Sequence, residues 1–284
     1  MAMQVIEPVP GIGSSLEAAA EEYERMSASL NALLEELAGG GSGTHLVRRL
    51  DRSTGPSVPA DERVKARLFG SFGLSYCGVE LESVLPGQAA TILKYVLSQG
   101  RRHIPKDTLL ELLWPEAEPD IASRRLRVVI HTLRRHLAAL RPGGENLLLT
   151  LDNGYLLNPR VDIWTDVDEF ERRRANGWRM HRAGLLEGAY QEFEQAEALY
   201  RGDYVEDEPY AEWTFLRRET LRDSYMSVLS MLAQISLEWE DYTGAIIWAQ
   251  KLLAQDSCNE DAYRLLIASH IGLGQHNRAA HWYG

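Results

Sequence analysis

The sequence has very little cysteine and no long apolar run. Cys77 and Cys258 are the only cysteines among 284 residues, which excludes a disulfide framework and fits a reducing compartment. No apolar run approaches the roughly 18 residues that a membrane-spanning helix requires, and no charged-then-apolar signal segment opens the chain. The content of 45% hydrophobic and 25% charged residues is that of an ordinary globular protein. We therefore expect a soluble, cytoplasmic protein.

Patterns that indicate catalysis or metal binding are missing as well. The sequence has no nucleophile elbow, no Cys–His pairing and no kinase signature. His131 and His136 are five residues apart, not the three or four that place two ligands on one helix face. We therefore predict that the chain is not an enzyme and has no catalytic residues, no cofactor and no metal site. Three further histidines are predicted to lie on the surface of helical repeats: His270, His276 and His281.

The net charge of −11 is unevenly distributed along the chain. Residues 1–60 contain 4 Lys/Arg and 8 Asp/Glu, and residues 161–284 contain 12 and 22. Residues 61–160 contain 14 Lys/Arg and 11 Asp/Glu, so this segment alone has a positive balance, of +3. A basic segment between acidic flanks is compatible with one DNA-contacting domain, although a balance of this size also arises by chance.

The first 60 residues predict one helix followed by a flexible linker. Apolar residues recur every seven positions from Leu16 to Leu37, with a second set three residues later, which is an a/d heptad pattern over three heptads. The glycine-rich segment at 39–43 then ends the helix. It is not a phosphate-binding loop, because no strand precedes it and no Lys-Ser/Thr pair follows it. The helix Leu16–Leu37 either forms a homodimer as a coiled coil or packs on its own protein.

Residues 61–160 predict short strands, then three helices, then a hairpin. Two or three antiparallel strands are expected within 64–77, from alternating apolar residues and intervening glycines. Pro105 opens the second helix, and an Asn-Gly step between two apolar strands predicts the hairpin. The expected helices cover 88–98, 106–113 and 121–140, and the hairpin strands cover 147–151 and 154–157. This order is typical of a winged helix-turn-helix with an additional N-terminal sheet.

The third helix has an apolar face and a basic face. Its apolar stripe consists of Leu126, Ile130, Leu133 and Leu137. The opposite face holds Arg124, Val128, His131, Thr132 and Arg135, and the flanks hold Arg125, Arg127 and Arg134. Arginine in the major groove recognises guanine, threonine and valine contact thymine methyls, and flanking arginines reach phosphates. The helix is therefore predicted to bind DNA, and the alternative is a solvated basic face on a structural helix.

These segments resemble the OmpR-type winged-helix domain and, more narrowly, the Streptomyces antibiotic regulatory protein family. The resemblance is in Leu109–Pro115, in Leu126–Leu137 and in Asp152–Leu157. It implies that the third helix enters the major groove and that the hairpin contacts DNA through Asn153, Gly154 and Tyr155. It also implies that the loop Trp114–Asp120 contacts RNA polymerase through Trp114, Glu116, Glu118 and Asp120. His131 and Thr132 depart from the commoner choices of the family, so no operator sequence is implied.

Residues 161–284 predict an all-α domain of tetratricopeptide-like repeats. Ala245 and Ala279 are 34 residues apart, as are Trp248 and Trp282, and 34 is the tetratricopeptide period. Ala189 takes the same role one repeat earlier, if an insert of 22 residues within 204–225 is allowed. The motifs Asp162–Asp166 and Tyr200–Asp207 resemble the bacterial transcriptional activation domain. Such repeats either bind a protein partner or only pack on the winged helix.

We thus expect a mainly α protein with three parts: residues 1–60, a winged helix-turn-helix in 61–160, and a repeat domain in 161–284. The last predicted helix is incomplete at Gly284, so we expect a longer protein. The predicted function is sequence-specific binding of double-stranded DNA by a transcriptional regulator, with the resemblance implying an activator that recruits RNA polymerase. The alternative is an interaction scaffold whose winged helix docks protein.

Overall fold

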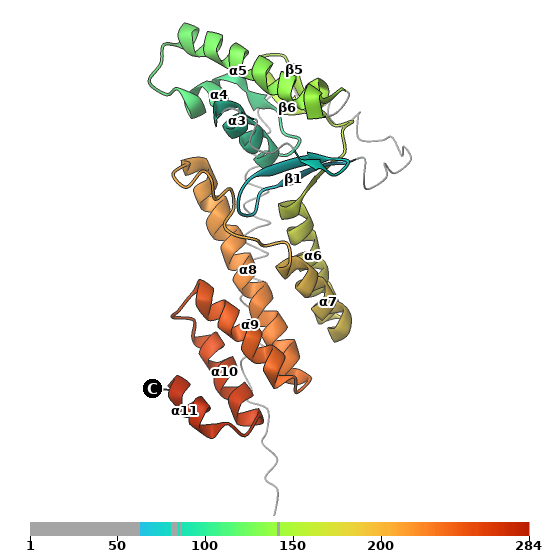
Figure 1. Cartoon of the computed structure of the whole chain (residues 1–284), viewed down its shortest axis with the longest axis vertical. Coiled ribbons are helices and arrows are strands. Elements are labelled where there is room, and N and C mark those ends of the chain that lie inside the picture. The colour runs from blue at the N-terminus through green and yellow to red at the C-terminus, as the bar shows by residue number, and fades with distance from the viewer. Residues whose placement is uncertain (1–62, 81–84, 86, 141–142, 284) are drawn as a thin grey trace, which may run out of the picture. The chain divides into compact units, whose positions relative to one another are not determined.

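The computed structural model describes residues 63–80, 85, 87–140 and 143–283 (Figure 1). By its internal contacts the chain divides into Met1–Ser57 and Val58–Gly284, and every described residue belongs to the second unit. The predicted coiled-coil helix Leu16–Leu37 and the linker at 39–43 lie outside the described residues. None of the helices described is both long enough and apolar enough to span a bilayer.

The first sheet has four strands in the order β3-β2-β1-β7. The strands β1 (Val64–Arg67), β2 (Gly73–Tyr76) and β3 (Val79–Glu80) form the antiparallel series that the sequence predicts. The fourth strand, β7 (Ile163–Thr165), pairs with β1 in parallel and was not predicted. The sheet therefore continues beyond residue 160, where we expected the DNA-binding domain to end.

Three helices follow the first strands: α3 (Gly87–Ser98), α4 (Lys106–Leu113) and α5 (Pro119–Leu140). Their bounds lie within two residues of the predicted ones. The helix α5 starts two residues early because Pro119 occupies its first turn, where a missing backbone N–H costs nothing. Asp120 therefore lies in the first turn of α5, which corrects its predicted place in a loop.

The hairpin forms a second sheet, with the order β4-β6-β5. A 3₁₀ helix, η2 (Gly144–Leu147), leads into β5 (Leu148–Leu151), which pairs with β6 (Gly154–Leu157) as predicted. The outer strand, β4 (Ile104–Pro105), was missed because it has only two residues.

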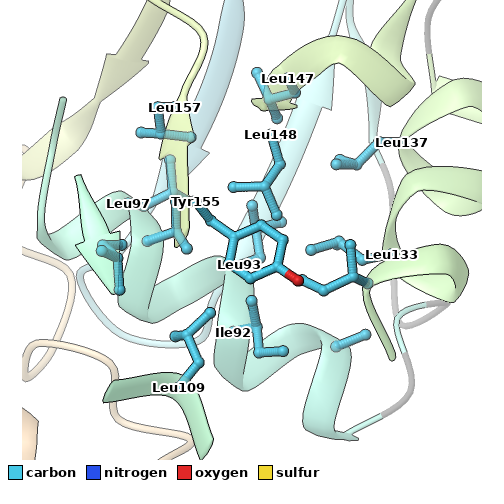
Figure 2. Close-up of a cluster of buried hydrophobic side chains, with 14 of the residues drawn as sticks. Ile92, Leu93, Leu97, Leu109, Leu133, Leu137, Leu147, Leu148, Tyr155 and Leu157 are labelled. Carbon is cyan, nitrogen blue, oxygen red and sulfur yellow. The ribbon is translucent and has the colours of Figure 1, made fainter. Parts of the chain in front are cut away.

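One apolar core joins the three helices, the hairpin and β1. The predicted stripe of α5 is confirmed, since Leu126, Ile130, Leu133 and Leu137 are at most 4% exposed. Figure 2 shows Leu133 beside the side chain of Tyr155 of β6, and Leu137 and Leu93 of α3 belong to the same core. Burial of four aliphatic side chains stabilises the domain by roughly 1.5–3 kcal/mol each, so the rotation of α5 about its own axis is fixed.

The helical half consists of three consecutive helix pairs. They are α6 (Asp166–Arg182) with α7 (Leu186–Glu197), α8 (Glu212–Glu238) with α9 (Tyr242–Gln255), and α10 (Glu260–Gly272) with α11 (His276–Tyr283). Each helix packs on the next along the chain. The predicted repeat positions Ala189, Ala245 and Ala279 are buried on the second helix of each pair, which confirms the tetratricopeptide-like pattern.

The prediction for His270 was wrong. His270 is 4% exposed, and its Nδ1 lies 3.0 Å from Oε1 of Gln275 in the turn that follows α10. His276 and His281 are exposed, as expected. The sequence spacing of the three histidines does not distinguish them, because only the packing of α10 on its neighbours decides which side is covered.

The winged-helix half and the helical half are joined at the residues that follow β1. The Asp166 carboxylate at the start of α6 accepts hydrogen bonds from the backbone N–H groups of Leu68 (2.7 Å) and Phe69 (3.1 Å). The loop before α8 continues this contact, since the N–H of Val205 donates to the carbonyl of Leu68 and that of Gly70 to the carbonyl of Asp203. Burial raises the pKa of Asp166, and the backbone hydrogen bonds oppose that shift.

We predict that Asp166→Ala lowers the free energy of unfolding by about 2–6 kcal/mol, because the buried N–H groups of Leu68 and Phe69 lose their acceptor at about 1–3 kcal/mol each. Asp166→Asn keeps one acceptor oxygen and should lose less. Urea denaturation of the two variants measures the difference. The control is Asp168→Ala, which removes a carboxylate from the same helix turn but leaves Leu68 and Phe69 bonded. Equal losses for Asp166→Ala and Asp168→Ala would contradict the assignment.

Candidate DNA interface

The predicted contact residues of α5 lie mainly on its exposed face. The residues that are exposed are Arg124, Arg125, Arg127, Val128, His131 and Arg135, and those that are half-buried are Thr132 and Arg134. Val128 is 66% exposed. An aliphatic side chain in water among arginines gains nothing from folding, but it is suited to contact with a thymine methyl.

Arg134 differs from the other arginines of α5 because the hairpin uses its guanidinium. Nη2 of Arg134 donates to the carbonyl of Leu148 at 2.9 Å and to Oγ1 of Thr150 at 2.8 Å. Nε of Arg134 also donates to the Leu148 carbonyl, at 3.3 Å. This side chain therefore holds β5 against α5, and its contact with a phosphate stays a prediction.

Of the three predicted wing residues, only Asn153 is exposed. Gly154 is buried, and a Cβ built at this position would lie 2.4 Å from the carbonyl oxygen of Ile104. Glycine is therefore required for β4 to approach β6. Tyr155 is 8% exposed, and its ring belongs to the core (Figure 2). Contact of Gly154 and Tyr155 with DNA stays a prediction, and the exposed residues Asp152 and Asn153 form the tip of the wing.

The hydroxyl end of Tyr155 lies at the edge of this core, close to two arginines. Burial raises the pKa of Tyr155, and the charges of Arg134 and Arg127 act to lower it. The same groups line a recess between the start of α4, the exposed face of α5 and the hairpin. Its lining residues are Lys106, Arg127, Ile130, His131, Arg134, Thr150 and Tyr155.

This basic recess adds Lys106, which the sequence reading did not single out. Lys106 is the first residue of α4, so its ammonium group adds to the positive end of the helix dipole. Two arginines, a lysine and two hydroxyl groups around one recess are the donors that a phosphate group prefers. A lysine directly after Pro105 at a helix start was the signal that could have identified it.

The loop between α4 and α5 divides into an anchor and an exposed part. Trp114 is half-buried against the core, and its backbone N–H donates to the carbonyl of Leu110 at 2.8 Å to end α4. Glu116 and Glu118 of the loop are exposed, and so is Asp120 in the first turn of α5. A partner would therefore meet the three carboxylates, whereas Trp114 holds the loop in place.

No metal site accompanies this surface in the described part of the chain, where no three His, Cys, Asp or Glu residues gather as ligands. Nδ1 of His136 lies 2.7 Å from the carbonyl oxygen of Thr132, four residues earlier on α5. His136 is half-buried and lies on the side of α5, whereas His131 lies on its exposed face.

Two family models match the chain in succession. Residues 82–157 match the model described as "Transcriptional regulatory protein, C terminal", which covers α3, α4, α5 and the hairpin. Residues 165–284 match the "Bacterial transcriptional activator domain", which covers the helical half. The order of the two domains is the one that the sequence motifs predict.

Curated relatives share this arrangement at low identity. The transcriptional regulatory protein MoaR1 of Mycobacterium tuberculosis is 22% identical over 204 residues, which cover 72% of this chain and 65% of MoaR1. The regulatory protein DnrI of Streptomyces peucetius is 29% identical over 174 residues, which cover 59% of this chain and 63% of DnrI. The chain thus spans less than two thirds of the length of either relative.

The fold is also that of a solved structure. Mycobacterium tuberculosis EmbR, determined in complex with a low-affinity phosphopeptide, superposes with a TM-score of 0.67 at 19% identity, over 78% of this chain and 58% of EmbR. The chain thus carries a C-terminal domain of transcriptional regulatory proteins followed by a bacterial transcriptional activator domain, and it is similar to regulators that include DnrI, as the resemblance to the Streptomyces antibiotic regulatory protein family implies.

Proposed function

We propose that this chain binds a specific double-stranded DNA sequence through α5 and the wing and regulates transcription, as an activator. The proposal rests on the rotation of α5 about its own axis. Its aliphatic stripe is fully buried, so Arg124, Val128 and Arg135 are held outward together on one exposed face. A helix of this kind fits the major groove, where arginine bonds guanine and an apolar group meets thymine.

The surroundings of α5 support the same orientation on DNA. Arg127 and Lys106 belong to the basic recess beside the helix, and Asn153 lies at the exposed tip of the wing. Side chains of this type fix the register of a protein on the phosphate backbone without reading sequence. We propose that the protein binds DNA in the cytoplasm and that it catalyses no reaction.

RNA polymerase is the proposed second partner. The exposed carboxylates Glu116 and Glu118 lie on a short loop that Trp114 anchors to the core, so they are displayed on a firmly held element at one end of α5. The rival function is a scaffold whose winged helix docks protein. Selection from random duplex DNA with the purified chain separates the two, because a scaffold would enrich no sequence motif.

The first prediction from the proposed function compares two arginines, Arg127 and Arg134, that have equivalent positions in the sequence pattern of α5. Arg127→Ala should weaken binding to every duplex and flatten the slope of log K against log salt by about 1, with unchanged thermal stability. Arg134→Ala should instead lower the free energy of unfolding by about 1–2 kcal/mol, because β5 loses its bonds to α5. Fluorescence anisotropy at several salt concentrations, together with thermal unfolding, tests both. A stable Arg134→Ala protein would refute the role in holding β5.

The second prediction concerns sequence readout. Alanine at Arg124 or Arg135 should cost about 1–3 kcal/mol on duplexes that carry the guanine it contacts, and much less on duplexes mutated at that base pair. Binding of a panel of single-base variants of the selected site measures this dependence. Arg125→Ala is the matched control, since it removes an exposed flanking arginine and should affect all duplexes equally. If alanine at Arg124 and at Arg135 lowered the affinity equally for every duplex of the panel, both arginines would contact only phosphates.

The third prediction concerns the loop between α4 and α5. The double variant Glu116→Lys/Glu118→Lys should lower activated transcription in a purified system with RNA polymerase while DNA affinity stays unchanged. The side chains are exposed and form no ion pair with other described residues, so the fold should tolerate the change. If DNA affinity changed in parallel with transcription, the loop would belong to the DNA surface instead.

A further inference from the structure

A second recess lies on a different part of the surface, where α3 and α4 meet the segment that leads into α8. It measures about 890 Å³. One wall comes from Thr91 and Tyr95 of α3 and from Thr108, Glu111 and Leu112 of α4, with Pro115 after it. The other wall comes from residues 207–211, which precede α8, and from Glu212 and Trp213 at its start. In Figure 1 this end of α8 lies next to α3 and α4.

The lining of this recess is acidic. It contains the carboxylates of Glu111, Asp207, Glu208 and Glu212, and no lysine or arginine. Beneath it, the buried Lys94 bonds to both Asp207 and Glu208. One cation shared by two carboxylates leaves a surplus negative charge there. Glu111 and Glu212 add to it, because both are exposed and neither forms an ion pair within the described part of the chain.

Three aromatic side chains stand among these carboxylates. Tyr95 and Trp213 meet edge to face, with ring centroids 5.4 Å apart and planes at 84°. Tyr210 is 96% exposed, although a ring of this size normally gains from burial. A guanidinium group stacks on aromatic faces and pairs with carboxylates at the same time, which a compact ammonium group does less well. The combination is therefore complementary to arginine.

The loop that forms the second wall is held rigidly before any partner arrives. Arg218 of α8 donates to four carbonyl oxygens of this loop, at 3.0 to 3.3 Å: those of Tyr204, Val205, Glu208 and Pro209. The side chain of Glu208 is also fixed from α3, since Oγ1 of Thr91 donates to its Oε1 at 2.7 Å. A wall that is already ordered loses little conformational entropy on binding.

We propose that this acidic, aromatic recess binds an extended, arginine-bearing segment of a partner protein. Its four carboxylates repel nucleic acid, so it is a surface separate from the basic face of α5. Because the lining comes from α3, α4 and the segment that leads into α8, the recess exists only while the two halves of the chain stay joined, and Lys94 is one of the contacts that join them.

The test uses the full chain and a fluorescein-labelled peptide of alternating Gly-Ser and Arg residues that carries three arginines. We expect saturable binding by fluorescence anisotropy, weaker binding of the same peptide with lysine in place of arginine, and none with glutamate. The variant Glu111→Gln/Glu212→Gln should weaken binding of the arginine peptide at least about fivefold, as the loss of an ion pair implies. Tyr210→Ala should weaken its binding about threefold, as the loss of a cation–π contact implies.

The matched control is Glu187→Gln/Glu194→Gln, which removes two exposed carboxylates from α7 and changes the net charge equally. It should leave binding unchanged. Equal weakening by the two double variants would mean that only net charge matters, and absence of saturable binding to the native chain would overturn the proposal. Thermal unfolding verifies that each variant is folded, since all five substituted side chains are exposed.

Discussion

Four aliphatic side chains of α5 lie in the core that α3, α4 and the hairpin share. Their burial decides how α5 is rotated, and that rotation decides which arginines face solvent. The same contact places the hairpin, because Arg134 bonds β5 from one side of the helix and Tyr155 of β6 packs beside Leu133 (Figure 2). The exposed basic face and the wing beside it are therefore two outcomes of one packing arrangement, and neither can be displaced without disturbing the other.

The elements with clear periodicity could be predicted from the sequence. The stripe of α5 follows helical spacing over twelve residues, and the Asn-Gly step fixes the hairpin, so both were located within two residues. The strands β4 and β7 have two and three residues. Segments that short show no alternation, and they become strands only because a partner strand is already in place. For the same reason the sequence did not show that the first sheet takes a strand from beyond residue 160.

The individual site residues were less predictable than the helix that carries them. Arg127 and Arg134 occupy equivalent flanks of α5 in the sequence, and only the position of β5 separates a free guanidinium from one that is bonded. The motif Asn153-Gly154-Tyr155 reads as an exposed turn, yet Gly154 is required by the approach of β4 and Tyr155 fills the core. In each case the contact that decides the role of the residue comes from a segment distant in the sequence, so no local pattern predicts it.

The parallel pairing of β1 with β7 has a consequence for how the chain can be divided. With β2 on one side and β7 on the other, β1 has no free edge. A fragment that ended at residue 160 would lose β7 and expose a strand edge with unpaired N–H and C=O groups, next to a core that is already apolar. Such edges recruit strands from neighbouring molecules. The first residues of the helical half thus cover one edge of β1 and belong to the sheet that precedes the DNA-binding helices.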